Sequence, residues 1–236
     1  MTIKHKFSTI HTQYKKNRKV EWIVIHYTAG VTSRMNSALN LAAYFATRPD
    51  DCSADFTVDD YDVVQYNPDI LNRYTWHCGG SKYNNKGGKY YGKCTNANSI
   101  GIEVCSTNST GKMQNANDKT YSFTDAVVKN TEELVKYLMK EYNIPADHVI
   151  RHYDVTGKLC PGIIGWNAES GSEAKWEQFK KNISATTTTT NTTANTTPAK
   201  KKLYYVQVGA FSVKENAEKY LKEVKKHYPN AFIKIM

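Results

Sequence analysis

The sequence lacks any long apolar run. No segment approaches the roughly 20 consecutive apolar residues that a helix needs to cross a bilayer, which argues against a membrane-spanning chain. Residues 1–19 are basic but contain no apolar stretch of the kind that a secretory signal requires. We therefore expect synthesis in the cytoplasm without a signal peptide.

Cysteine is scarce, and its count of five is odd. Five thiols in 236 residues do not make the dense framework of a small disulfide-stabilised protein. This usage is typical of a protein made in a reducing compartment, with at least one thiol free to bind a metal. A disulfide among the others stays open at this point. The five are Cys52, Cys78, Cys94, Cys105 and Cys160.

Acidic side chains are also in short supply, with 22 against 32 basic ones, for a formal net charge of +10. Residues 199–236 alone hold nine lysines and three glutamates. Such a segment suits a polyanionic surface, or is simply a solvated basic face. The chain contains no recognisable helix-turn-helix, zinc-finger or aromatic sheet motif, so we do not expect nucleic acid to be its partner.

One break in composition divides the chain. Residues 185–202 are rich in Thr, Asn and Ala and contain no large apolar side chain. Such a segment cannot bury enough surface to offset the entropy of ordering it, so we interpret it as a linker. The linker separates a first domain, residues 1–184, from a C-terminal unit, residues 203–236.

The first domain alternates strands and helices, as an α/β protein does. Residues 20–29 form a Val- and Ile-rich run typical of a buried strand. Residues 33–48 and 122–143 have apolar side chains at helical spacing, with Ser33 as the expected N-cap of the first helix. This order predicts one mixed central sheet flanked by helices. Further predicted elements are two strands within 54–68 around a turn at Asp59–Asp60, strands at 99–106 and 148–154, and a helix at 175–183.

Three residues have the chemistry of a metal site. His26 ends the predicted buried strand, His152 lies at the end of another strand, and Cys160 follows it closely. Two imidazoles and a thiolate give three protein ligands and leave a fourth position open for water, as in catalytic zinc sites. From spacing alone, the alternative is two structural histidines and a small buried cysteine.

The segments around these residues resemble the zinc-dependent N-acetylmuramoyl-L-alanine amidases, a family that includes phage amidases and the peptidoglycan recognition proteins. Five matching segments occur in the family's order over residues 20 to about 165. The resemblance implies the fold of that family, one zinc ion held by His26, His152 and Cys160, and hydrolysis of the amide bond between N-acetylmuramic acid and L-alanine. The segments are WIVIHYTA (22–29), CSADFTVDD (52–60), TWHCGG (75–80), NSIGIEV (98–104) and RHYDVTGKLCPG (151–162).

The resemblance also assigns catalytic groups. Glu103 matches the family's catalytic glutamate and lies among apolar neighbours that favour a raised carboxyl pKa, so we expect it to accept a proton from water. Lys158, two residues before Cys160, is expected to stabilise the tetrahedral oxyanion. Considered alone, Glu103 is better explained as a solvent-facing strand residue, and Lys158 as one surface lysine among many.

Three further residues are expected to contact substrate: His77, in a loop where the family keeps a histidine, and also Asn98 and Thr28. A loop-capping role is the alternative for His77. The sequence departs from the family at Asp55, where many relatives have a histidine. A carboxylate cannot replace an aromatic hydrogen-bond donor, so Asp55 either orients a zinc-bound histidine or caps a turn.

The C-terminal unit predicts a strand at 203–211, a helix at 213–228 and a strand at 230–236. It resembles the first half of a sporulation-related (SPOR) repeat, a module that binds peptidoglycan without stem peptides. One such half is below the size at which a core usually becomes self-sufficient. We expect either that two chains pair their half-units, giving a homodimer, or that the unit is a frayed tail on a monomer.

These features predict a peptidoglycan hydrolase. The leading interpretation is a phage endolysin, which leaves the host cytoplasm and then degrades the wall of a Gram-positive, clostridial or related, bacterium. The alternatives are a bacterial or prophage autolysin with the same activity, and a non-catalytic module that only recognises peptidoglycan. The presence of Cys160 argues against the non-catalytic module, because loss of this ligand would be expected there.

Overall fold

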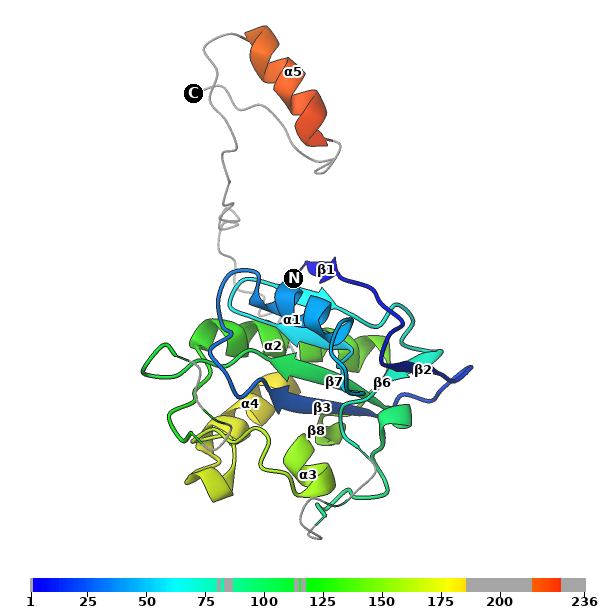
Figure 1. Cartoon of the computed structure of the whole chain (residues 1–236), viewed down its shortest axis with the longest axis vertical. Coiled ribbons are helices and arrows are strands. Elements are labelled where there is room, and N and C mark those ends of the chain that lie inside the picture. The colour runs from blue at the N-terminus through cyan, green and yellow to red at the C-terminus, as the bar shows by residue number, and fades with distance from the viewer. Residues whose placement is uncertain are drawn as a thin grey trace, which may run out of the picture. The chain divides into compact units, whose positions relative to one another are not determined.

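The chain forms two compact units, residues 1–188 and 189–236. All the strands described lie in the first unit (Figure 1). Among the helices described, none is long and apolar enough to cross a membrane. The computed structural model describes residues 2–79, 82, 87–112, 115, 118–185 and 214–225.

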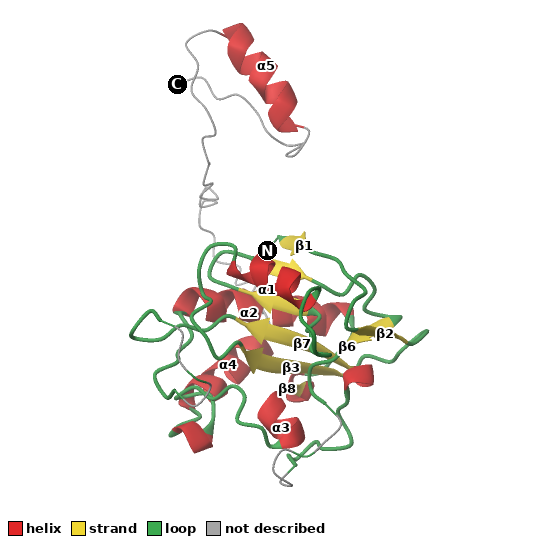
Figure 2. Ribbon diagram, in the orientation of Figure 1, coloured by secondary structure: helices red, strands yellow, loops and turns green. Residues whose placement is uncertain are grey.

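Six strands form the central sheet of the first unit. They are β1 (Ile3–His5), β3 (Trp22–Tyr27), β4 (Phe56–Val58), β5 (Val63–Gln65), β7 (Ser99–Val104) and β8 (Val149–Arg151). Their order across the sheet is β1, β5, β4, β7, β3, β8. All neighbouring pairs are parallel except β4 and β5, which flank the predicted turn. Figure 2 shows helices on both sides of this sheet, so the predicted mixed sheet flanked by helices is confirmed.

Strand β3 lies inside the sheet, which explains its run of apolar residues. All six of its residues are buried, because strands pair with both of its edges and helices cover both faces. Successive side chains alternate between the two faces. Ile23 and Ile25 belong to one hydrophobic cluster, whereas Trp22 and Val24 belong to another. His26 therefore projects from the same face as Trp22.

Helices α2 (Asp125–Glu141) and α4 (Ala174–Ser184) pack on the Ile23 face. The Thr124 hydroxyl caps α2 by accepting a hydrogen bond from the Val127 N–H at 3.1 Å. The buried side chains of both helices recur at helical spacing and join the strands in the largest core. They are Val127, Leu134, Val135, Leu138, Trp176, Phe179 and Ile183.

The opposite face carries shorter elements. Helix α1 (Ser37–Phe45) packs against β4 and β5, and the short helix α3 (His152–Thr156) follows β8 directly. A separate two-stranded antiparallel ribbon joins β2 (Thr12–Tyr14) to β6 (Arg73–Thr75). In open sheets of this kind, ligands bind outside the carboxyl ends of the parallel strands.

Two predictions of element boundaries were wrong. Helix α1 begins at Ser37 rather than near Ser33, because Asn36 adopts a left-handed conformation (φ 65°) that asparagine tolerates well. The Ser33 hydroxyl instead donates to Asp60 at 2.5 Å. The predicted strand at 148–154 ends at Arg151, and His152 opens α3.

Other differences concern short or undescribed segments. Strands β1, β2 and β6 have three residues each, too few to show an alternating pattern in the sequence. The helix predicted at 213–228 is present as α5 (Lys214–Lys225). The strands predicted at 203–211 and 230–236 lie outside the described residues, as does the interpreted linker beyond residue 185.

Candidate active site

Two of the predicted residues are neighbours across the sheet. His26 on β3 and Glu103 on β7 are direct partners in the parallel register, near the carboxyl ends of both strands. Residues paired in register project to the same face. The adjacent Ile102 lies in the core beneath α2, so Glu103 and His26 share the opposite face.

Helix α3 brings the other two predicted ligands to His26. Gly157 ends the helix in a left-handed conformation (φ 81°) and turns the chain back. The Tyr153 N–H then donates to the Cys160 carbonyl at 3.0 Å, which holds the returning segment against α3. The ligand atoms of His26, His152 and Cys160 all lie within 4.8 Å of one another. Of the residues described, no other group of three has this arrangement.

The protonation of these groups fits a bound cation. Burial lowers the pKa of His26 well below 6.5 and that of His152 to about 3, so both imidazoles are neutral and able to bind a metal. Burial raises the pKa of the Cys160 thiol to about 12, so a thiolate here requires a positive charge beside it. Two neutral imidazoles and one thiolate suit zinc, with one coordination position left open.

A hydrogen-bonded chain fixes which nitrogen of His26 faces the other ligands. The Ser99 hydroxyl donates its proton to the Thr95 carbonyl at 2.5 Å. The same hydroxyl lies 3.1 Å from His77 Nε2, and because its proton is already used, it accepts a hydrogen bond from that nitrogen. With Nε2 protonated, the neutral His77 ring offers Nδ1 as an acceptor for the Nε2–H of His26, at 3.1 Å. His26 Nδ1 is then unprotonated, and it lies 3.8 Å from Cys160 Sγ.

His77 itself is held on two sides. The Asn96 side-chain carbonyl accepts a hydrogen bond from the His77 N–H at 3.1 Å. The ring lies directly on the backbone of Gly101, where an added Cβ would be 2.5 Å from His77 Cγ. Burial, the largest single influence, lowers the pKa of His77, but Cys78 and Asp55 together raise it above its ordinary value. A cation held by His26 opposes protonation of His77.

Glu103 has the properties of a proton acceptor beside this group. Burial raises its pKa to about 8, against the opposing effect of the Lys158 ammonium. Its Oε2 is buried and has no hydrogen-bond partner in the described part of the chain. Lys158 is exposed, and after burial it is the largest influence on the pKa of both Glu103 and His152. Both predicted catalytic groups thus lie beside the three candidate ligands.

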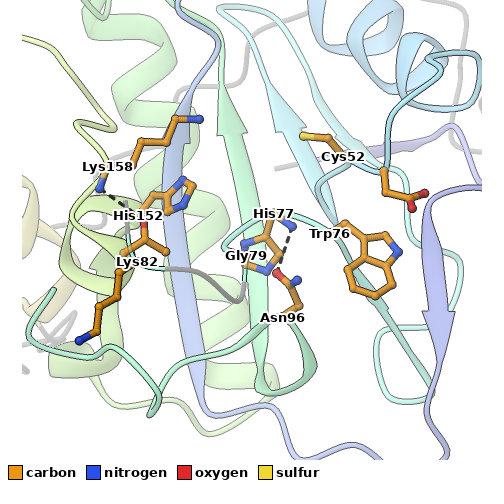
Figure 3. Close-up of a pocket in the computed structure, with 10 residues that line it drawn as sticks. Cys52, Trp76, His77, Gly79, Lys82, Asn96, His152 and Lys158 are labelled. Atoms are coloured by element: carbon orange, nitrogen blue, oxygen red, sulfur yellow. Dashed lines mark hydrogen bonds between the residues drawn. The ribbon is translucent and has the colours of Figure 1, made fainter. Parts of the chain in front are cut away.

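A cleft of about 390 Å³ opens at this site. Figure 3 shows Lys158 and His152 on one side of it and Cys52 and Trp76 on the other. Asp51 is the only carboxylate of its lining among the residues described, so the surface favours an anionic substrate. The remaining lining residues are His77, Gly79, Lys82, Asn96 and Thr156.

Comparison with known proteins decides the family. The model of the N-acetylmuramoyl-L-alanine amidase family (Amidase_2) matches residues 16–163, which include all three candidate ligands. The chain belongs to this amidase family. A SPOR domain model also matches residues 168–235. Its first part covers α4, whose Trp176 and Phe179 lie in the core of the amidase unit.

Two curated amidases of Bacillus subtilis illustrate the relationship. The chain is 35% identical to N-acetylmuramoyl-L-alanine amidase XlyB over 69% of its own length and 42% of that protein. It is 34% identical to amidase CwlA over 71% of its own length and 50% of that protein. The chain therefore spans about half the length of these relatives.

Solved structures agree with the fold. The catalytic domain of XlyA superposes with a TM-score of 0.54 at 28% identity, covering 78% of this chain and 99% of that one. A mutant endolysin from Bacillus subtilis superposes with a TM-score of 0.52 at 30% identity, covering 77% and 98%. The architecture derived above is thus that of amidase-family catalytic domains.

Two residues predicted to contact substrate, Asn98 and Thr28, make other contacts in the structure. The Asn98 side chain donates to Glu21 and to the Lys93 carbonyl and accepts from Thr95, so it closes a capping box and does not line the cleft. Asn96 lines the cleft instead. In the sequence, Asn96 and Asn98 are separated by one residue, and this pattern does not show which of the two side chains faces the cleft.

Thr28 is the second of these residues. Its hydroxyl is 2.6 Å from the Thr32 hydroxyl and accepts a hydrogen bond from the Ser106 N–H at 3.1 Å. These contacts fix the turn after β3, and Thr28 is not part of the cleft lining described above.

Asp55 has a structural role. It is fully buried and accepts hydrogen bonds from the Gly101 N–H, Asn67 and Thr75 at 2.8, 2.7 and 2.9 Å. The Arg18 guanidinium lies 3.9 Å away and supplies the balancing charge. The hypothesis that Asp55 orients a metal-binding histidine is wrong, because these partners occupy its carboxylate.

Proposed function

We propose that this chain is a zinc-dependent N-acetylmuramoyl-L-alanine amidase that hydrolyses the amide bond between N-acetylmuramic acid and L-alanine. The main support is that the ligand atoms of His26, His152 and Cys160 lie within 4.8 Å of one another, with Glu103 paired to His26 across the sheet. The family match supports the substrate class, and the basic cleft suits the carboxylates of a peptidoglycan stem.

His26 Nδ1, a nitrogen of His152 and Cys160 Sγ would hold the zinc ion. When bound, zinc supplies Lewis-acid polarisation and acidifies water. Glu103 accepts the proton of the attacking water and passes it to the departing nitrogen of L-alanine. The Lys158 ammonium stabilises the negative charge that develops on the carbonyl oxygen. His77 acts as a positioning residue, because it fixes the tautomer of His26.

A paired measurement of metal and activity tests this function. We expect about one zinc per chain in the wild type, and loss of both zinc and amide hydrolysis on purified walls in Cys160→Ser. Cys105→Ala, which removes a buried thiol away from the cleft, is the matched control and should keep both. Hydrolysis that persists in Cys160→Ser, or that a chelator does not stop, would rule the proposal out.

We propose an endolysin role as the biological setting, with the wall of a Gram-positive, clostridial or related, bacterium as the target. The endolysin among the superposed structures supports this role. Loss of turbidity in suspensions of such cells, with and without chelator, tests it. A protein that binds walls without releasing amino groups would instead be a recognition module.

We propose that residues 1–184 form the catalytic domain, 185–202 a linker and 203–236 a SPOR-like unit that binds glycan strands. The SPOR match and the amphipathic sequence of α5 support the last assignment. We also propose that two chains pair through these units into a homodimer. Light scattering of the full chain at several concentrations tests the pairing, and a strictly monomeric mass would exclude it.

A further inference from the structure

Two thiols that are not candidate metal ligands lie in one buried cluster beside the cleft. Cys78 directly follows His77, and Cys94 lies farther along the chain, just before Asn96. Both are buried and pack in the same small hydrophobic cluster, together with Trp22 and Val24. Among the described residues they do not belong to any group of three with metal-binding geometry.

The same polar residues anchor Cys78 and the His77 ring. Asn96 Oδ1 accepts hydrogen bonds from the N–H groups of both His77 and Cys78, at 3.1 and 2.8 Å. Ser99 Oγ lies 3.1 Å from His77 Nε2 and 3.8 Å from Cys78 Sγ. The position of the Cys78 sulfur is therefore coupled to the position of His77.

We propose that Cys78 and Cys94 are a modification site, at which a disulfide forms when the protein meets an oxidising medium. The bond would close the loop of residues 79–93, which contributes Gly79 and Lys82 to the cleft. If the proposed function also holds, the bond stabilises the backbone next to His77 and with it the hydrogen bond to His26.

A low-molecular-weight disulfide such as oxidised glutathione is the co-reactant. Local opening of the buried cluster exposes Cys78 to this oxidant. The Cys78 thiolate then attacks one of its sulfurs, forms a mixed disulfide and releases one glutathione thiolate. Cys94 then loses its proton, attacks the Cys78 sulfur and expels the second glutathione. The protein loses two protons and two electrons, and the oxidant becomes two thiols. The neighbouring Cys94 lowers the pKa of the Cys78 thiol, which favours Cys78 as the first nucleophile.

Mapping of the native protein tests the proposal. The full chain, with its metal, is incubated with oxidised glutathione, free thiols are alkylated, and unreduced peptides are analysed by mass spectrometry. We expect a peptide that links Cys78 to Cys94, and a melting temperature about 5–10 °C above that of the reduced protein. Cys78→Ala and Cys94→Ala should each lack both effects, whereas Cys105→Ala should keep them.

Three outcomes would overturn the proposal: no linked peptide under native conditions, a link that forms only in denaturant, or the same thermal shift in Cys94→Ala as in the wild type. The readouts are covalent mass and melting temperature rather than wall hydrolysis. A failure here is therefore distinguishable from a failure of the amidase assignment.

Discussion

Replacing Asp55 with alanine should destabilise the fold without removing the metal. The carboxylate is fully buried and accepts three hydrogen bonds, from Gly101, Asn67 and Thr75. Its removal leaves three buried donors without an acceptor and the Arg18 guanidinium without its counter-charge. At roughly 1.5 kcal/mol for each hydrogen bond to a charged acceptor, the loss is about 4–5 kcal/mol, which agrees with the cost of breaking a buried ion pair.

Urea unfolding followed by tryptophan fluorescence measures this loss. All four tryptophans lie within residues 1–188, so the signal reports the unit that contains Asp55. Asp55→Asn keeps one acceptor oxygen and should lose about half as much stability. Asp50→Ala, which removes an exposed carboxylate paired with Arg48, is the control and should leave the free energy of unfolding unchanged.

The opposite pattern would refute this reasoning. If Asp55→Ala unfolded at the wild-type urea concentration but lost its zinc, the carboxylate would act on the metal site after all. The expected result is zinc content per folded molecule equal to wild type, because no hydrogen bond joins Asp55 to His26, His152 or Cys160 among the described residues.

Glu103→Gln should retain zinc and lower kcat/KM on purified walls about 100- to 10,000-fold, because an amide cannot accept the proton of the attacking water. Metal analysis and a rate assay on the same sample measure the two quantities. In metal-free protein the pKa of Glu103 is about 8, above its ordinary 4.5, so the folded state binds more protons between these values. The free energy of unfolding should therefore fall as pH rises from about 4.5 to 8, and Glu103→Gln should reduce that slope in urea titrations. Gly101→Ala should displace the His77 ring and thereby lower zinc affinity about 10- to 100-fold, as measured with a competing chelator. An unchanged zinc affinity would show that His77 does not position His26.

The long, regular elements were predictable because their signals are local. The apolar run of β3 and the helical periodicity of α2 and α4 survive in the structure almost as expected. The start of α1 was not predictable, because it depends on the left-handed backbone at Asn36 and on Ser33 bonding to a distant Asp60. Such contacts between segments far apart in sequence override a local capping preference.

The candidate site likewise contains residues that the sequence predicts and residues that only the structure can assign. The metal-binding chemistry of His26, His152 and Cys160 is visible as residue types beside a family resemblance, and the structure brings their ligand atoms together. The roles of Asn96 and Asn98 could not be separated, because both are amides in the same short turn. Only the fold shows that Asn98 closes the turn while Asn96 faces the cleft.

Gly101 shows why the metal site and the sheet constrain each other. A glycine inside a strand costs roughly 0.5–1 kcal/mol relative to alanine, so its presence in β7 requires a compensating contact. Here the missing side chain leaves room for the His77 ring, which lies on the strand and accepts the hydrogen bond from His26. The Gly101 N–H also donates a hydrogen bond to the buried Asp55 carboxylate. One small residue thus connects the buried ion pair that stabilises the sheet to the hydrogen-bonded histidines that orient the candidate zinc ligand, and a larger residue there would have to disturb one of the two.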